Sequence, residues 1–138
     1  MRMTAVISGG IKLSFVTAGL FLASSLGASA QSLTPMRGEA KSFTDQFAFR
    51  VYPANPYPRP IRVEVHVYDE NFVPIQAAVM PPAAMLTPED NRSVMVMVPF
   101  EGRLERKVRI CAEAVPFEQN ATRLRTQVCG RFIAHRVR

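Results

Sequence analysis

Residues 61–68 alternate strictly between apolar and polar side chains, and this alternation restricts the fold more than any other feature of the sequence. The apolar positions are Ile61, Val63, Val65 and Val67. The polar positions are Arg62, Glu64, His66 and Tyr68. Successive side chains of a strand point to opposite faces, so this pattern predicts a strand with one face buried and the other in solvent.

Further segments of the chain also have the composition of strands. They are residues 47–52, 92–98, 107–114 and 122–137. Turn-forming residues separate these segments, and the four prolines of residues 53–60 predict a stiff connection, because proline cannot donate a ladder hydrogen bond. No segment after residue 30 has a convincing amphipathic helical pattern. The sequence therefore predicts an all-β fold, an immunoglobulin-like antiparallel β-sandwich of about seven strands.

Residues 1–30 are predicted to be a cleaved signal peptide. Arg2 and Lys12 give a positive start, an apolar run of about 14 residues follows, and Ala28, Ser29 and Ala30 form a small-residue cleavage site. The alternative is an uncleaved membrane anchor, but the run is shorter than the roughly 18 to 20 residues that span a bilayer. We expect an exported, periplasmic protein without stable membrane insertion after cleavage. A secreted or surface-associated location stays open.

The predicted mature chain, residues 31–138, has the size of one domain. It holds all 11 acidic and 15 of the 17 basic residues, which gives a net charge of about +4. This charge favours anionic partners. The arginines are spread along the chain without aromatic residues on which bases could stack, so we expect no nucleic-acid partner.

Cys111 and Cys129 are the only cysteines, and export predicts a disulfide between them. Alternation places both on the outer face of neighbouring strands. If Cys111 lies opposite Cys129 in a hairpin, then Val108 lies opposite Phe132, and the apolar faces of the two strands remain in phase. Free thiols or a redox pair are the alternatives.

The sequence predicts no catalytic residues. His66 and His135 are the only near-neutral bases, the first on the polar face of a strand and the second in a basic tail. The adjacent acidic pairs at residues 69–70 and 89–90 lie in predicted turns, where carboxylates usually cap the backbone. We expect a protein that is not an enzyme and that has no cofactor.

Methionines suggest one alternative to this expectation. Thioethers favour Cu(I), and the candidate ligands are Met80, Met85, Met95 and Met97, together with His66. By alternation, Met95 and Met97 are the only two that share a strand face. Methionine also fills gaps and forms adaptable surfaces, so the prediction is that the chain has no metal site.

The order of motifs resembles the N-terminal immunoglobulin-like domain of PapD-like pilus-assembly chaperones. The resemblance rests on an opening strand with an arginine (residues 32–37), a strand followed by a turn at residues 69–71, the passage at residues 81–94, and a long last strand that ends at residues 135–138. It covers essentially the whole mature chain. Chaperones of this family have two domains, and the sequence stops where the second is expected.

The resemblance implies that the last strand is lent to an exported, pilin-like subunit by strand addition. The implied partner-binding side chains are Leu124, Thr126, Val128 and Phe132. In the family, two basic residues anchor the terminal carboxylate of the subunit. Arg37 matches the first; the second aligns with Gly130, and Arg131 takes its place after a shift of one residue.

Three functions therefore remain open after the sequence analysis. The first is a chaperone-like binding module, the second a structural or accessory subunit of a pilus or another surface assembly, and the third a periplasmic protein that binds a small ligand or copper. The identity of the partner and the oligomeric state are not determined by the sequence.

Overall fold

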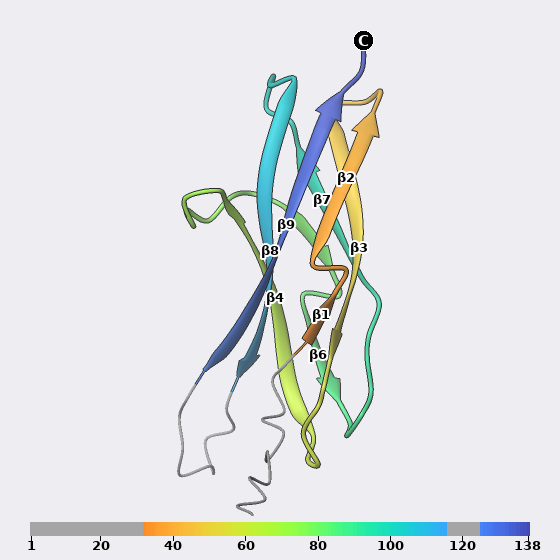
Figure 1. Ribbon diagram of the computed structural model, residues 1–138, viewed down its shortest axis with the longest axis vertical. Coiled ribbons are helices and arrows are strands. Elements are labelled where there is room, and N and C mark those ends of the chain that lie inside the picture. Colours follow the sequence, from red (N-terminus) through yellow and green to blue (C-terminus); the bar gives the residue numbers. More distant parts are fainter. Residues whose placement is uncertain (1–31, 116–124) are drawn as a thin grey trace, which may run out of the picture.

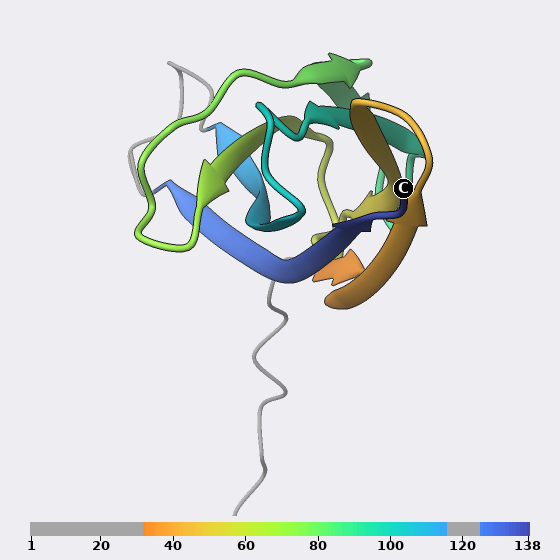
Figure 2. The same cartoon turned by 90° about the horizontal axis from the view of Figure 1, so that it is seen from above.

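The computed structural model describes residues 32–115 and 125–138 (Figure 1). The predicted signal peptide lies outside these residues. The described residues form nine strands in two sheets, which enclose one interior when the molecule is seen end-on (Figure 2). Within them, no helix has the length and hydropathy that crossing a lipid bilayer requires.

The four-stranded sheet has the order β1-β3-β7-β5. Its strands are β1 (Ser32–Thr34), β3 (Gln46–Ala54), β7 (Val94–Pro99) and β5 (Ala78–Met80). The five-stranded sheet has the order β2-β9-β8-β4-β6. Its strands are β2 (Arg37–Ser42), β9 (Thr126–Arg136), β8 (Glu105–Val115), β4 (Ile61–Asp69) and β6 (Ala83–Leu86).

The predicted alternation determines which side chains enter the core. The four apolar residues of β4 that alternation placed inside are at most 7% exposed, and their polar neighbours face outward. β7 in the other sheet supplies the opposite wall with Val94, Val96 and Val98, and β8, which pairs with β4, adds Val108 and Ile110 beside it; all five are nearly inaccessible to solvent. The predicted β-sandwich is therefore confirmed.

The opening strand differs from the prediction, because residues 32–37 do not form one strand. β1 pairs with β3 in one sheet, and after Pro35 and Met36 the chain continues as β2 in the other sheet. β2 pairs with β9 in the parallel direction, so the sandwich is not purely antiparallel. β5 and β6 are also additional to the predicted strands; each has four residues or fewer, which is too short to show alternation.

Candidate functional site

β9 is divided into two halves by the place where β2 begins. Residues 131–136 pair with β2 on one edge and with β8 on the other, and we call them the covered half. Residues 127–130 pair with β8, and we call them the open half. No strand among the described residues pairs with the second edge of the open half. Figure 1 shows β2 beside the C-terminal half of β9 only.

The backbone groups at this open edge can be identified from two hydrogen bonds. The N–H of Arg131 donates to the carbonyl of Met36 at 2.8 Å, and the N–H of Val137 donates to the carbonyl of Ser42 at 2.8 Å, both on the β2 side. Because successive residues of a strand direct their backbone groups to opposite edges, those of Gln127 and Cys129 face the same side. The open half therefore presents N–H and C=O groups to which a further strand can bond.

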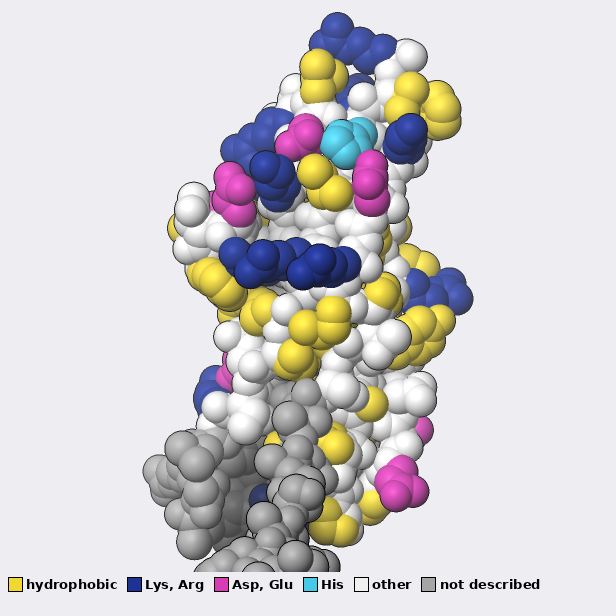
Figure 3. Space-filling model, viewed as in Figure 1, with side chains coloured by type: hydrophobic (Ala, Val, Ile, Leu, Met, Phe, Trp, Pro, Cys, Tyr) yellow, Lys and Arg dark blue, Asp and Glu magenta, His cyan; other side chains and the backbone are white. Residues whose placement is uncertain are grey.

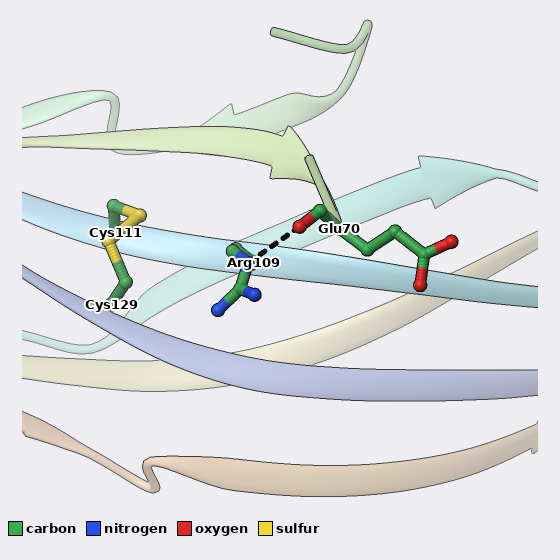
Figure 4. Close-up of a disulfide and its surroundings, with 4 residues drawn as sticks. All are labelled: Glu70, Arg109, Cys111 and Cys129. Carbon is green, nitrogen blue, oxygen red and sulfur yellow. Dashed lines mark hydrogen bonds between the residues drawn. A yellow bond between two sulfur atoms is a disulfide. The ribbon is translucent and has the colours of Figure 1, made fainter. Parts of the chain in front are cut away.

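The predicted disulfide is confirmed and lies in the open half. Cys111 of β8 and Cys129 of β9 are Cα partners, their Cα atoms are 4.0 Å apart, and their sulfurs are bonded (Figure 4). Val108 lies opposite Phe132, as predicted. The disulfide joins the open half to β8 on the side where a strand already exists, and it leaves the second edge of β9 unobstructed.

The four side chains proposed for partner binding have different environments. Leu124 lies outside the described residues. Thr126 is exposed, and Val128 is half-buried and packs against the core. Phe132 is 3% exposed and belongs to the core, where its ring centroid lies 4.8 Å from that of Phe49. This buried position does not fit an inserted side chain, because Phe132 would have to leave the core to reach a partner.

Phe132 also explains why residue 130 is a glycine. A Cβ atom at Gly130 would lie 2.7 Å from the Phe132 ring, and a Cβ atom at Gly38 on β2 would lie equally close to it. A side chain at position 130 would thus point into the core. Arg131 has the opposite orientation, is exposed, and is the Cα partner of Arg37. Of the two positions considered for the second anchor, Arg131 is the one beside Arg37.

Three arginines form a row across neighbouring strands of the five-stranded sheet. Arg37 of β2 is opposite Arg131 of β9, and Arg131 is opposite Arg109 of β8. Because the N–H of Arg131 bonds to the β2 side, the Arg109–Arg131 pair is of the non-hydrogen-bonded type, in which Cα atoms lie only about 4.5 Å apart. Like charges directly opposite each other destabilise a sheet. We call these three residues the arginine row; Figure 3 shows a band of Lys and Arg side chains across the middle of this face.

Arg109 is held in place by the turn after β4. Its Nε donates to the carbonyl of Glu70 at 3.2 Å, and its Cζ lies 4.4 Å above the centre of the Phe72 ring. The carboxylate of Asp69 accepts the N–H groups of Asn71 and Val73 at 2.8 and 2.9 Å, which orders the turn. In Figure 4 the terminal nitrogens of Arg109 are directed to the β9 side, and the Glu70 carboxylate points away from them.

The arginine row differs from several other charged side chains on the same face, which have carboxylate partners. His135 lies 3.4 Å from Glu39 and 3.5 Å from Glu105. Arg62 is 3.1 Å from Glu64, and Arg125 is 2.8 Å from Glu113. Within the described part of the chain, no carboxylate lies within ion-pair distance of Arg37, Arg109 or Arg131.

A shallow, open hollow of about 320 Å³ adjoins the row. Its lining contains three cationic residues, the acidic residue Glu70 and apolar residues. The lining residues are Glu70, Lys107, Val108, Arg109, Arg131, Phe132 and Ile133. A site of this kind can bind an anion, because guanidinium groups form paired, charge-assisted hydrogen bonds to carboxylates.

Sequence reasoning missed Arg109 as a member of this site. Alternation placed it correctly on the outer face of its strand, but alternation does not tell which strands are neighbours. The available signal was the predicted hairpin register, since Cys111 opposite Cys129 also places Arg109 opposite Arg131.

The methionine and histidine candidates for copper do not form one cluster. Met80, Met95 and Met97 lie on the outer face of the four-stranded sheet, where Met80 is the Cα partner of Met95. Met85 and His66 lie on β6 and β4 of the other sheet. The described residues also contain no group of three His, Cys, Asp or Glu side chains suited to a metal ion.

Comparison with solved structures gives matches over three quarters of the chain. A structure of the Salmonella enterica SafA pilin in complex with the SafB chaperone matches with a TM-score of 0.63 and 22% identity, over 78% of this chain and 54% of the other. The Escherichia coli chaperone DraB matches with a TM-score of 0.62 and 18% identity, over 76% and 54%.

The chain has the fold of the N-terminal domain of PapD-like pilus chaperones. The resemblance inferred from the sequence is thus confirmed for the fold. The chain spans about half the length of the chaperones that it matches. No protein-family model and no curated protein sequence matches it.

The same fold also forms nearly the whole of a smaller protein. SSP-19, an MSP-domain protein-like family member of Caenorhabditis elegans, matches with a TM-score of 0.54 and 10% identity over 98% of its chain. This solved chain therefore consists almost entirely of one sandwich of this type.

Proposed function

We propose that this protein is an exported, chaperone-like binding module that adds a strand of a partner subunit to the open half of β9. The observation that carries the proposal is the edge at residues 127–130, with which no strand of the described part of the chain pairs and which lies on the last strand of a chaperone-type sandwich. An unpaired edge binds a further strand through backbone hydrogen bonds, and alternate side chains then determine its register. Solved structures with this fold include a chaperone with a pilin and a chaperone with a tip adhesion subunit.

The arginine row supports one orientation of the added strand. β2 runs parallel to β9 and begins at Arg37, directly after the open half ends. A partner strand that occupies the open edge in line with β2 and runs in the same direction has its C-terminus beside Arg37 and Arg131. In this orientation its terminal carboxylate accepts hydrogen bonds from two guanidinium groups that have no acidic partner among the described residues.

Location in the periplasm is part of the proposal. It is supported by the predicted signal peptide and by the disulfide, which is expected to persist in an oxidising compartment. The partner is then another exported chain, and one of its strands is still free to pair with the open half of β9.

Photo-cross-linking in the cell tests the proposal. A photoreactive amino acid is placed at Gln127 in the open half, or at Ile133 in the covered half as the matched control, and adducts are identified by mass spectrometry. We expect a small exported subunit to be linked at position 127, close to its C-terminus, and not at position 133. Adducts of the protein with itself alone would support a self-assembling subunit instead.

The anchor is tested in the same cells. Arg37→Gln and Arg131→Gln are each expected to reduce the adduct at position 127 about tenfold, since a charge-assisted hydrogen bond is lost. Arg62→Gln removes an equal charge from the same face, where Arg62 already has Glu64 as its partner, and should leave the adduct unchanged. Equal reductions in all three variants would contradict a specific anchor.

A further inference from the structure

The arginine row holds one more guanidinium than a single carboxylate requires. A carboxylate has two oxygens, and Arg37 and Arg131 can each donate to it from neighbouring strands. Arg109 follows as the third member of the row, on the far side of β9, and Lys107 lines the same hollow. Lys107 has Glu105 at 3.7 Å, so the positive charge that has no carboxylate partner among the described residues extends from the open edge as far as Arg109 on β8.

Arg109 is positioned before any ligand binds. Its Nε is bonded to the carbonyl of Glu70, and the plane of its guanidinium group is supported by the ring of Phe72. Both contacts leave the terminal nitrogens available, and these are directed to the β9 side (Figure 4). On β9, Arg131 is the Cα partner of Arg109. Ordering the side chain in advance lowers the entropy lost on binding, which favours a specific contact over diffuse attraction.

We propose that Arg109 is a specificity-determining residue that binds a second acidic group next to the terminal carboxylate of the partner. The preferred partner then ends in Asp or Glu: its α-carboxylate lies at Arg37 and Arg131, and its side-chain carboxylate reaches over β9 to Arg109. This inference rests on the proposed function, since it concerns the same partner and extends the same site.

Three small probes that differ in their number of carboxylates test this role of Arg109. N-acetyl-L-aspartate carries both carboxylates, whereas N-acetyl-L-asparagine has nearly the same shape and only the α-carboxylate; N-acetyl-L-asparagine amide carries neither. Each is titrated into the full mature chain at low ionic strength, and dissociation constants are read from the backbone and arginine Nε–H signals in NMR spectra. We expect binding of the aspartate to be about tenfold tighter than binding of the asparagine, as one further charge-assisted contact implies.

Variants separate a specific contact from general attraction. In Arg109→Gln, N-acetyl-L-aspartate should bind about as tightly as N-acetyl-L-asparagine. The difference in affinity between N-acetyl-L-asparagine and its amide should stay as it is in the unchanged protein. Arg62→Gln changes the net charge equally and should preserve the tenfold ratio. Because Arg109 is partly exposed and the core does not depend on it, the variant is expected to fold; an unchanged melting temperature checks this.

The two proposals fail in different ways. If N-acetyl-asparagine binds no better than its amide, the carboxylate anchor of the proposed function is wrong. If it does bind better but the aspartate gains nothing, or if Arg109→Gln preserves the gain, only the role of Arg109 is overturned. Inorganic phosphate that binds as tightly as the aspartate would show that the row responds to charge alone, which also overturns the role of Arg109.

Discussion

The two halves of β9 belong to one strand, share one neighbour in β8, and have different surroundings. The covered half is paired on both edges, contributes Phe132 to the core, and has His135 between two carboxylates. The open half is paired on one edge, is tied to β8 by the disulfide, and ends at the arginine row. The difference fits the proposal that the covered half stabilises the fold and the open half binds a partner strand.

The largest expected effect comes from truncation in the covered half. Phe132→Ala should lower the free energy of unfolding by about 3–5 kcal/mol, because Gly38 and Gly130 flank the ring and have no side chains that could fill the cavity. Val128→Ala in the open half removes a half-buried side chain and should cost about 1.5 kcal/mol. Urea unfolding measures both, and equal losses would contradict the division of the strand.

Removal of the disulfide should have the next largest effect. The Cys111→Ala, Cys129→Ala double variant opens a loop of 18 residues, which corresponds to about 3 kcal/mol of stability. Hydrogen exchange locates the loss: the N–H groups of Val128 and Gly130 should exchange faster than before, relative to the N–H groups of the covered half. A uniform acceleration along β9 would show that the disulfide does not act on the open half in particular.

A pair of proline variants gives the smallest change in stability and the sharpest comparison. Ile133 and Gln127 both direct their N–H groups to the outer edge of β9, but a strand pairs there at Ile133 only. Ile133→Pro should cost about 1–3 kcal/mol, since the ladder bond to β2 is lost. Gln127→Pro should cost less than about 0.5 kcal/mol, since its N–H has no strand to bond to.

Partner capture should respond in the opposite way to these two variants. Gln127→Pro removes a donor that an added strand needs, and it should abolish co-purification of the partner subunit with the tagged protein while the melting temperature stays nearly constant. A melting temperature that falls as far as in Ile133→Pro would show that the edge at Gln127 is already bonded within the chain.

Much of the fold could be predicted because alternation is a local property. The predicted strands recur as β3, β4, β7, β8 and β9 within a few residues, and the hairpin register followed from keeping Cys111 opposite Cys129 with both apolar faces in phase. β5 and β6 could not be predicted, since three or four residues cannot show a period of two. The opening segment was read as one strand, because its residues do not reveal that β1 and β2 lie in different sheets.

The candidate site was also predicted in part. The errors have the same cause as those in the fold, because alternation along one strand does not show which strands are its neighbours. Arg37 and Arg131 were singled out by resemblance, and the structure brings them into register. Arg109 was missed, and Phe132 was placed among the binding residues although it is buried. Alternation puts Phe132 on the same side as Val128, but it does not tell that the second sheet covers that side at Phe132 and covers Val128 only in part.

The sequence by itself determined the class of fold, the face to which each side chain of a long strand points, and the disulfide, because these depend on neighbours along the chain and on one hairpin. The tertiary structure alone decided that β2 begins at Arg37, that the described strands therefore leave one edge of β9 open before Arg131, and that three arginines meet at that boundary. These features depend on pairing between residues about 20 to 100 positions apart. Such pairing is determined by the packing of the whole sandwich, and no local pattern encodes it.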